Sequence, residues 1–488
     1  MRSYPMSAKR LSTKPLTLCL LAVLALNQSA AADLPLSPRP TEARWIPVIG
    51  GSISSLQRTQ GEEGMRSLSK HKTIVQNLLV ANCDDAGTGS LREVATNASD
   101  GETVDLTQLA CGTITLATGA ITISANNVSI VGNNSHVAGG KTVGSNDRIF
   151  KHTGNGTLTI TGLYLYDANY IGNQNAHGGC IYSAGSVMLT DSVVTHCIVA
   201  PQLSSTLAGG GGIYAQKNVG LLNSSVTSDQ VESDVARGGG IYVRGGITAK
   251  YSAISGNSVS GPNVLPSKGG GIYSLGIGQD TYLKGVLVSE NTADDSGAFF
   301  LHGSASSILS IVNSTISGNS GRLRVGGGTA YGGQRAYISN STFAFNQAGS
   351  ENPAVGFYSQ FLLTITSSIF STNLSDVGVP NDVHTNVGSI EGDKNLIEAS
   401  PDSLGFVTTG ECPRIGMLAD NGGPTLTHAL LHDSSAIDVG VSDPALLNDQ
   451  RGSGFPRVFG SAADIGAFER QAGPDDELFA GRFDSKCY

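Results

Sequence analysis

The chain has 488 residues, of which 64 are glycine, only 14% are charged and 6% are aromatic. It is long enough to bury a sizeable core, but its charge density is too low for a largely helical protein, so the composition favours β structure. The formal net charge of −9 makes nucleic acid and anionic membrane surfaces poor partners, and we expect neither.

Residues 1–32 are typical of an export signal. Four basic residues precede the apolar run 16–26, and Ala30–Ala32 supply small residues for cleavage near Asp33. The run has about half of the ~20 residues that a spanning helix needs. No later segment is long and apolar enough either, so we expect an exported chain with no integral membrane segment. Cleavage leaves 26 basic and 39 acidic residues, a net charge of −13. The proline-rich segment 33–75 predicts a flexible leader.

Six cysteines remain after cleavage, and an even number in an exported chain favours disulfides over metal ligation or reactive thiols. They are Cys83, Cys111, Cys180, Cys197, Cys412 and Cys487. The sequence does not fix their connectivity. Proximity along the chain favours the pairs 83–111 and 180–197, which leaves 412–487 as the third pair.

A repeat occupies the middle of the chain, marked by Ser, any residue, an apolar residue, two further residues and usually Asn. The spacings between its eight markers are 28, 32, 28, 34, 28, 27 and 27 residues. The markers are Asn169, Cys197, Asp229, Asn257, Asn291, Asn319, Asn346 and Asn373. The residue three before the marker is apolar in every copy. The residue eight before it is apolar in seven, the exception being Thr161. Such a period indicates a solenoid or an array.

The repeat length favours one coil of a parallel β-helix over a propeller blade, which runs to ~40–50 residues. Equivalent positions of successive coils then stack about 4.8 Å apart, so the apolar columns form a continuous interior. The six asparagines are expected to form an internal ladder of stacked amides. The sequence therefore predicts an all-β fold, a parallel β-helix of about nine or ten coils over residues 113–410, which we expect to be monomeric.

Both ends of the repeat carry motifs of a known kind. Residues 82–106, NCDDAGTGSLREVATNASDGETVDL, resemble the "GSLREA" opening of bacterial surface β-helix proteins, which implies an N-terminal cap at 76–112 with a capping helix at 91–97. Residues 420–469 contain DNGGPTLTHAL, SSAIDVG, DQRG and DIGAFE in order, and this region resembles the choice-of-anchor Q domain, which implies a small C-terminal domain at 411–470 before a tail at 471–488. The coils between are similar to polymorphic outer-membrane-type repeats.

The resemblance implies a right-handed, pectate-lyase-like β-helix exported to the outer surface of a Gram-negative bacterium or beyond it. It implies no reaction, because the family has no shared catalytic residues. The mode of attachment to the cell is left open. Residues 471–488 are too short for a membrane barrel, which needs at least eight strands of ~10 residues.

Charged loop residues are the best candidates for catalysis. Polysaccharide lyases and hydrolases need clustered carboxylates, sometimes with Ca²⁺, and lyases need a basic group beside a uronate proton. Arg237 and Lys268 each precede a glycine run and are expected to stack one coil apart, and Asp294 and Asp295 lie in the next coil. The alternative is that these are solvated charges along an exposed edge. If the protein is not a lyase, we expect no metal or other cofactor.

The glycine runs GGCIY and GGGIY recur once per coil at 178–182, 210–214, 238–242 and 269–273. They lack the Gly-Lys-Ser/Thr ending of a phosphate loop, so they are interpreted as turns. If the isoleucine points inward, the next residue points outward. In that case the aromatic residues at this position form an outward row, which comprises Tyr182, Tyr214, Tyr242, Tyr273, Phe300, Tyr331 and Tyr358. Such a row can stack on sugar rings, or it can be a structural ladder packed under a loop.

The sequence thus favours a non-enzymatic, adhesin-like or glycan-binding scaffold that is secreted or displayed at a cell surface. Its partner would be a polysaccharide or a glycan of a host or cell surface. A polysaccharide lyase or glycoside hydrolase of the β-helix type, and a purely structural spacer, are the alternatives.

Overall fold

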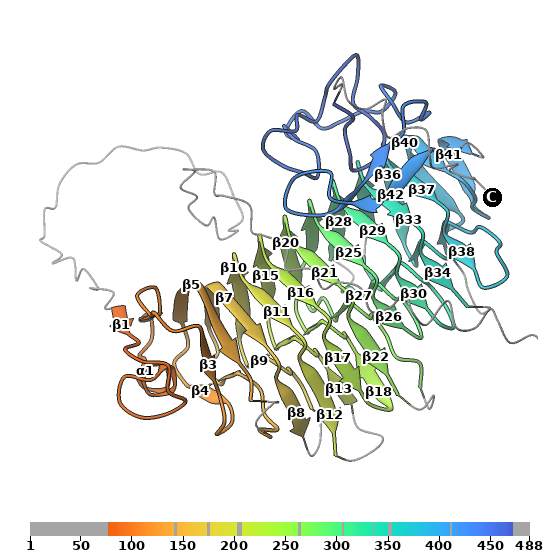
Figure 1. Cartoon of the computed structure of the whole chain (residues 1–488). Helices are drawn as coiled ribbons and strands as arrows, with labels where there is room; N and C mark the ends of the chain where they lie inside the picture. The colour runs from red at the N-terminus through yellow and green to blue at the C-terminus, as the bar shows by residue number, and fades with distance from the viewer. Residues whose placement is uncertain are drawn as a thin grey trace, which may run out of the picture. The chain divides into compact units, whose positions relative to one another are not determined.

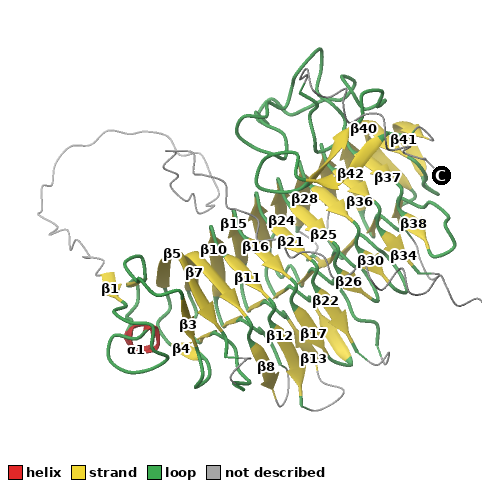
Figure 2. Cartoon of the chain, viewed as in Figure 1, coloured by secondary structure: helices red, strands yellow, loops and turns green. Residues whose placement is uncertain are grey.

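The computed structural model is a parallel β-helix of about 11 turns with almost no helix (Figures 1 and 2). The residues that it describes are 77–140, 144–172, 176–202, 207–261, 265–304, 307–333, 335–349, 354–409 and 412–471. The expected signal segment and leader, and all but the first residue of the expected tail, lie outside these ranges.

Sheet A is the largest sheet, with 21 strands. Its strands are β1 Asn77–Leu79, β2 Thr103–Asp105, β3 Thr113–Thr115, β5 Val128–Ala138, β7 Thr157–Tyr166, β10 Ser186–Thr190, β11 Val193–Thr195, β15 Val219–Leu222, β16 Ser225–Thr227, β20 Ile247–Lys250, β21 Ala253–Ser255, β24 Thr281–Lys284, β25 Leu287–Ser289, β28 Ile308–Val312, β29 Thr315–Ser317, β32 Arg335–Ser339, β33 Thr342–Ala344, β36 Leu362–Thr366, β37 Ile369–Ser371, β40 Ser389–Ile397 and β41 Ser403–Thr409. Because β1 and β2 already pair in register within this sheet, the winding begins inside the segment expected to be only a cap, and the coil count exceeds nine or ten.

Sheet B has ten strands and contains the residues that follow the glycine runs. They are β4 Ile121–Ile123, β6 Phe150–His152, β9 Ile181–Ser183, β14 Ile213–Ala215, β19 Ile241–Val243, β23 Ile272–Ser274, β27 Phe299–His302, β31 Gly328–Tyr331, β35 Phe357–Ser359 and β39 Val383–Thr385. All their pairings are parallel, one coil to the next, as in Ile181 to Ile213 to Ile241.

Sheet C, with eight strands, follows the repeat marker. They are β8 Asn169–Gly172, β12 Ile198–Pro201, β17 Gln230–Glu232, β22 Ser258–Ser260, β26 Thr292–Ala293, β30 Ser320–Gly321, β34 Gln347–Ala348 and β38 Leu374–Ser375. A short two-stranded sheet, β13 Leu207–Gly209 with β18 Val235–Arg237, lies between sheets C and B along the chain. Each coil thus runs from sheet B through two strands of sheet A to sheet C and back.

The glycine runs form the corner that returns the chain to sheet B. Gly238 has a φ of +60°, a conformation that side chains disfavour. A Cβ on Gly239 would lie 2.3 Å from the carbonyl oxygen of Gly270 in the next coil. The run therefore reflects backbone packing between coils, as expected for a turn.

The interior holds the expected apolar columns, but the sequence register is one residue out in the coil of β7. Val194 pairs with Leu165, and Leu189 pairs with Ile160. The polar exception Thr161 is thus not in the column at all, because the buried Ile160 occupies that position. The two-residue side-chain period of a strand makes a one-residue shift exchange the inner and outer faces.

An internal amide ladder runs along the corner before sheet C. In Asn257, both the backbone N–H and the side-chain Nδ2 donate to Oδ1 of Asn291, each at 3.0 Å, and the same pattern continues through Asn319, Asn346 and Asn373. All five asparagines are fully buried. The ladder therefore satisfies buried polar groups across five coils.

Asn169 does not join this ladder. It pairs with Ile198 at the start of sheet C, so the buried Ala168 occupies the position of the marker, and the Asn169 side chain lies 3.5 Å from that of Asn146. The ladder ends instead in two carboxyl groups, Asp229 at one end and Asp382 at the other. Burial raises the pKa of Asp382 to about 7.

The N-terminal cap contains α1, Leu91–Asn97, at the expected position. Ser90 accepts a hydrogen bond from the N–H of Glu93 as the N-cap, and the Glu93 carboxylate accepts from the N–H of Gly89, the residue before the cap. Its seven residues cannot cross a bilayer, and the described part of the chain has no helix that can. Disulfides join Cys83 to Cys111 and Cys180 to Cys197, with Cα atoms 6.3 and 5.5 Å apart. Cys487, the expected partner of Cys412, lies outside the described residues.

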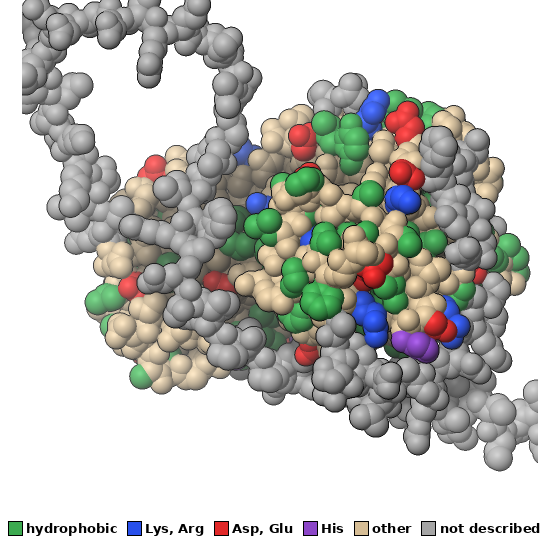
Figure 3. All heavy atoms as spheres, turned by 90° about the horizontal axis from the view of Figure 1, so that it is seen from above, with side chains coloured by type: hydrophobic (Ala, Val, Ile, Leu, Met, Phe, Trp, Pro, Cys, Tyr) green, Lys and Arg blue, Asp and Glu red, His purple; other side chains and the backbone are tan. Residues whose placement is uncertain are grey.

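The C-terminal segment packs directly on the last coils. It contains an antiparallel pair, β42 Ile415–Ala419 with β43 Thr427–Leu430. Thr315 of β29 donates to the side chain of Gln450 at 2.6 Å, and Ser317 lies 2.8 Å from His428. Apolar residues of both parts form one buried cluster. Charged side chains of both signs are interspersed over the face seen from above (Figure 3).

Candidate functional site

The outward row on sheet B is real, but half of it is covered. Ile213 and Ile241 are fully buried in the core, so the tyrosines after them face the other way, as expected. Yet the exposed fractions of Tyr214 and Tyr242 are only 3% and 6%. These two rings point outward from the core, yet they are not accessible to solvent.

The cover comes from the chain that leads into the glycine runs. The His177 ring lies parallel to that of Tyr214, with centroids 4.3 Å apart, and a Cβ on Gly209 would lie 2.3 Å from Tyr242. Burial, followed by the charge of Arg148, lowers the pKa of His177 to about 4, so the ring is neutral at neutral pH. The part of the row at Tyr214 and Tyr242 is therefore a structural ladder under a loop, and stacking of a sugar there is excluded.

The rings also pack on one another. Centroid distances are 5.4 Å from Tyr182 to Tyr214, 5.1 Å from Tyr214 to Tyr242, 5.2 Å from Tyr242 to Tyr273 and 5.7 Å from Tyr273 to Phe300. These are distances at which aromatic pairs stabilise each other. Tyr182 and Tyr273 remain half-buried.

The row changes at the coil of β31. Phe300 pairs with Thr329, which pairs with Tyr358, so Tyr331 is two residues away from the position expected for it. Its partner is His302, and the two ring centroids lie 5.1 Å apart. Tyr331 is 39% exposed, the most open ring among the expected stacking residues. Tyr358 is half-buried and donates to Asn386 at 2.9 Å.

The expected charged column also forms. Arg237 and Lys268 lie opposite each other in adjacent coils, and Lys268 lies opposite Asp295. Lys268 Nζ is 3.6 Å from the Asp295 carboxylate and 4.1 Å from the centroid of Phe300. Arg237 donates to the carbonyl groups of Ala236 and Pro266, both at 2.9 Å.

The carboxylates of this column already have protein partners. Asp294 accepts from the backbone and hydroxyl of Ser267 at 3.0 and 2.8 Å and forms an ion pair with Arg322 at 2.7 Å. Asp295 accepts from Ser296 and pairs with Lys268. No group of three potential metal ligands occurs within the described residues. Both carboxylates therefore bind other groups of the protein, and these contacts hold the loops in place.

Lys268 is the residue of this column with an altered acidity. Burial lowers the pKa of its ammonium group, the charges of Arg237 and Arg324 lower it further, and Asp295 opposes the change. Its side chain is 28% exposed. A lysine of this kind can act as a base, but the two carboxylates expected to act with it, Asp294 and Asp295, are already engaged by other groups of the protein.

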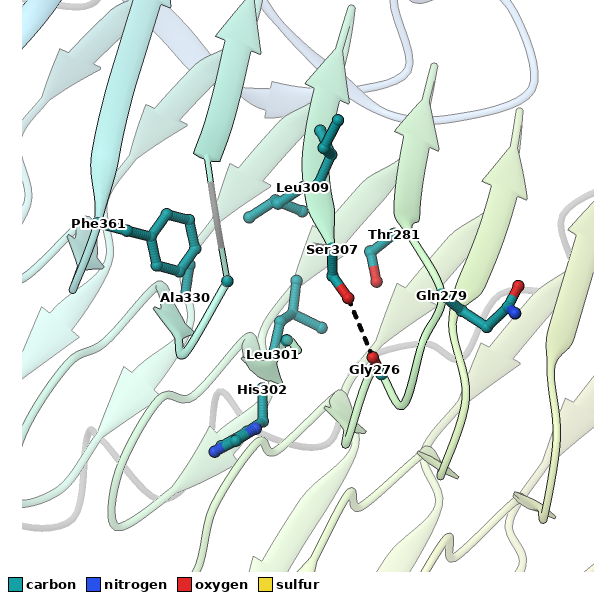
Figure 4. A pocket seen from close by; sticks show the side chains of 12 residues that line it. Gly276, Gln279, Thr281, Leu301, His302, Ser307, Leu309, Ala330 and Phe361 are labelled. Carbon is teal, nitrogen blue, oxygen red and sulfur yellow. Dashed lines mark hydrogen bonds between the residues drawn. The ribbon is translucent and has the colours of Figure 1, made fainter. Parts of the chain in front are cut away.

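A small pocket opens at the corner between sheets B and A (Figure 4), and its lining includes His302, whose ring contacts that of Tyr331. Its apolar wall is formed by Leu301, Leu309, Ala330 and Phe361. Its cavity volume is about 20 Å³, room for one water molecule or one methyl group. The pocket exists because this coil has small inward residues. The inward column that contains Leu309 continues to Ala336, and the one that contains Leu301 continues to Ala330.

The rim of the pocket is polar. Ser307 donates to the carbonyl of Gly276 at 3.1 Å, and the ring of His302 lies at the edge next to Tyr331 (Figure 4). Thr281 also lines the pocket and is 6% exposed. Its hydroxyl makes no hydrogen bond to another described residue. This arrangement combines an exposed aromatic ring, an apolar recess and unused hydrogen-bonding capacity.

Comparisons with known proteins add no assignment: the chain matches no family model, no curated protein and no solved structure.

The sequence interpretation missed the pocket. It treated Tyr331 as one more member of the row, because the spacing of aromatic residues was used to set the register. The signal that could have identified the pocket is the run GGGTAYGG at 326–333, which places Gly328 where both neighbouring coils have phenylalanine and Ala330 where the preceding coil has Leu301. Small residues at inward positions are harder to recognise in a sequence than regularly spaced aromatic residues.

Proposed function

We propose that this protein is an exported, non-catalytic β-helix scaffold that binds a glycan at the open part of its sheet B face, around Tyr331. The observation that carries the proposal is the pairing of Tyr331, 39% exposed, with His302 beside a pocket of mixed polarity. Aromatic faces stack on the apolar faces of sugar rings, while polar rims bind hydroxyl groups. The disulfides fit an oxidising compartment, as does the resemblance to bacterial surface proteins with a choice-of-anchor Q domain.

A glycan array with the exported chain tests this function. The chain offers a matched control, because Tyr337 is also 39% exposed but lies on sheet A. We expect Tyr331→Ala to lose about tenfold or more in affinity for the glycan that the wild type binds, since one aromatic contact supports about 1–2 kcal/mol. Tyr337→Ala should bind as the wild type does. Equal losses in the two variants, or no binding by the wild type, would contradict the proposal.

A polysaccharide lyase is the second candidate, and one observation favours it: the lowered pKa of Lys268 in a cluster with Arg237. The engaged carboxylates of Asp294 and Asp295 argue against it. Incubation with uronic-acid and neutral polysaccharides, with and without Ca²⁺, distinguishes the two functions. The scaffold proposal expects no unsaturated products and no new reducing ends. Products that disappear in Lys268→Ala would establish the lyase instead.

A further inference from the structure

Thr281 occupies a position that the rest of its column gives to apolar residues. Register across sheet A places Val187, Val219 and Ile247 before it and Leu309, Ala336 and Leu363 after it, and all six are buried. The Thr281 hydroxyl makes no hydrogen bond within the described part of the chain, but it is not an enclosed polar atom, so its oxygen is open to the pocket that the residue lines. The fold gains nothing from this hydroxyl, because an aliphatic residue of the same size would pack equally well.

The same hydroxyl lines the pocket. Thr281 lies beside Ser307 (Figure 4), whose own hydroxyl is already engaged with the carbonyl of Gly276. On the other side are the apolar groups of Leu301, Ala330 and Phe361. The recess thus offers one unused hydroxyl and an apolar space for one methyl-sized group. The exposed ring of Tyr331 contacts His302, which also lines the pocket.

We infer that this pocket receives the acetyl group of an N-acetylated sugar. This inference rests on the proposed glycan-binding function and specifies its substrate class. The methyl group fills the apolar recess, the acetyl carbonyl oxygen accepts a hydrogen bond from Thr281, and the sugar ring lies against Tyr331. A sugar with a hydroxyl in place of the acetamido group leaves both the recess and Thr281 unused, and it binds more weakly for that reason.

Calorimetric titration of the exported chain tests the inference with two neutral tetrasaccharides, the β-1,4-linked tetramer of N-acetylglucosamine and cellotetraose. They differ at each ring only in the acetamido group. We expect the acetylated tetramer to bind about tenfold or more tightly. Thr281→Val and Ala330→Val should reduce that affinity about tenfold, to the level of cellotetraose, and should leave the affinity for cellotetraose unchanged.

Thermal unfolding of the same variants separates recognition from a structural role. Thr281→Val removes a hydroxyl that makes no hydrogen bond to the described residues and keeps the shape of the side chain, and Ala330→Val fills a void, so we expect both to keep or raise the Tm while binding is lost. A lowered Tm together with unchanged sugar discrimination would overturn the inference. Equal affinity of the wild type for the two tetramers would also overturn it but leave the glycan-binding function standing. If the wild type binds no glycan on the array, both the inference and the proposed glycan-binding function are wrong.

Discussion

Two rows of stacked side chains run across the coils of this protein, and they differ in burial and in how strictly they keep their register. The asparagine ladder lies inside the helix and keeps its register and hydrogen-bond pattern from Asn257 to Asn373. The aromatic row lies outside. It is half-buried at Tyr182, is buried under a covering loop at Tyr214 and Tyr242, and loses both its cover and its register at Tyr331.

The difference shows what keeps a repeated side chain in place. Each buried amide must find a partner in the next coil, so one residue out of register would leave several polar groups unsatisfied. An outward aromatic ring has no such requirement, since it can pack on a neighbouring ring, lie under a loop or face solvent. The inner row is therefore uniform, and the outer row can change from a structural ladder at Tyr242 to an accessible surface at Tyr331 within three coils.

The largest expected effect is at the centre of the ladder. Asn319 accepts from Asn291 and donates to Asn346 and to the carbonyl of Val288. Asn319→Ala leaves these groups buried without partners, and we expect it to lower the free energy of unfolding by about 4 kcal/mol, measured by urea denaturation. A loss below ~1 kcal/mol would show that the ladder carries little stability.

The covered part of the aromatic row comes next. Tyr242 contacts the rings of Tyr214, Tyr273 and His177 and lies against Gly209. We expect Tyr242→Ala to cost about 3 kcal/mol in the same urea measurement, because it removes a buried ring from a packed environment. An effect as small as that of an exposed tyrosine would mean that the cover does not form.

A substitution of Asp229, the carboxyl group at one end of the ladder, should instead raise the stability. Asp229 Oδ2 has no hydrogen-bond partner and occupies the place where the asparagines have a donating Nδ2. Asp229→Asn supplies that donor, and we expect it to stabilise the fold by about 2 kcal/mol at neutral pH.

This gain should depend on pH. Burial raises the pKa of Asp229 well above 3.8, so the wild type is most stable below that value and loses stability as the pH rises through the folded-state pKa. The difference between Asp229→Asn and the wild type should therefore vanish at low pH and grow with pH in thermal unfolding curves. The exposed Asp376→Asn removes the same charge and serves as the control. A gain independent of pH would contradict this account.

The smallest effect on stability is expected at the open end of the row. Tyr331→Ala removes an exposed ring and should change the free energy of unfolding by less than about 0.5 kcal/mol. Its consequence should appear in glycan binding, where Tyr242→Ala is uninformative because it disturbs the fold. A destabilisation by Tyr331→Ala similar to that of Tyr242→Ala would erase the distinction between the two parts of the row.

Much of this architecture is visible in the sequence because the repeat is dictated locally. The glycine at 238 follows from a left-handed turn, the isoleucine after it from the core, and the asparagine markers from the amide ladder. The failures are failures of register. Asn169 and Tyr331 were assigned by spacing, and loop lengths that vary between coils shift each of them away from the stacked position.

The resemblance to known β-helix proteins indicated the position of the capping helix, and the sequence by itself determined a parallel β-helix and its periodic core. These follow from alternation and turn chemistry within about 30 residues. Only the tertiary structure decided which outward rings are reachable, which carboxylates are already paired, and where a pocket opens beside Tyr331. Those properties depend on contacts between residues of different coils and loops, which no pattern within one coil specifies.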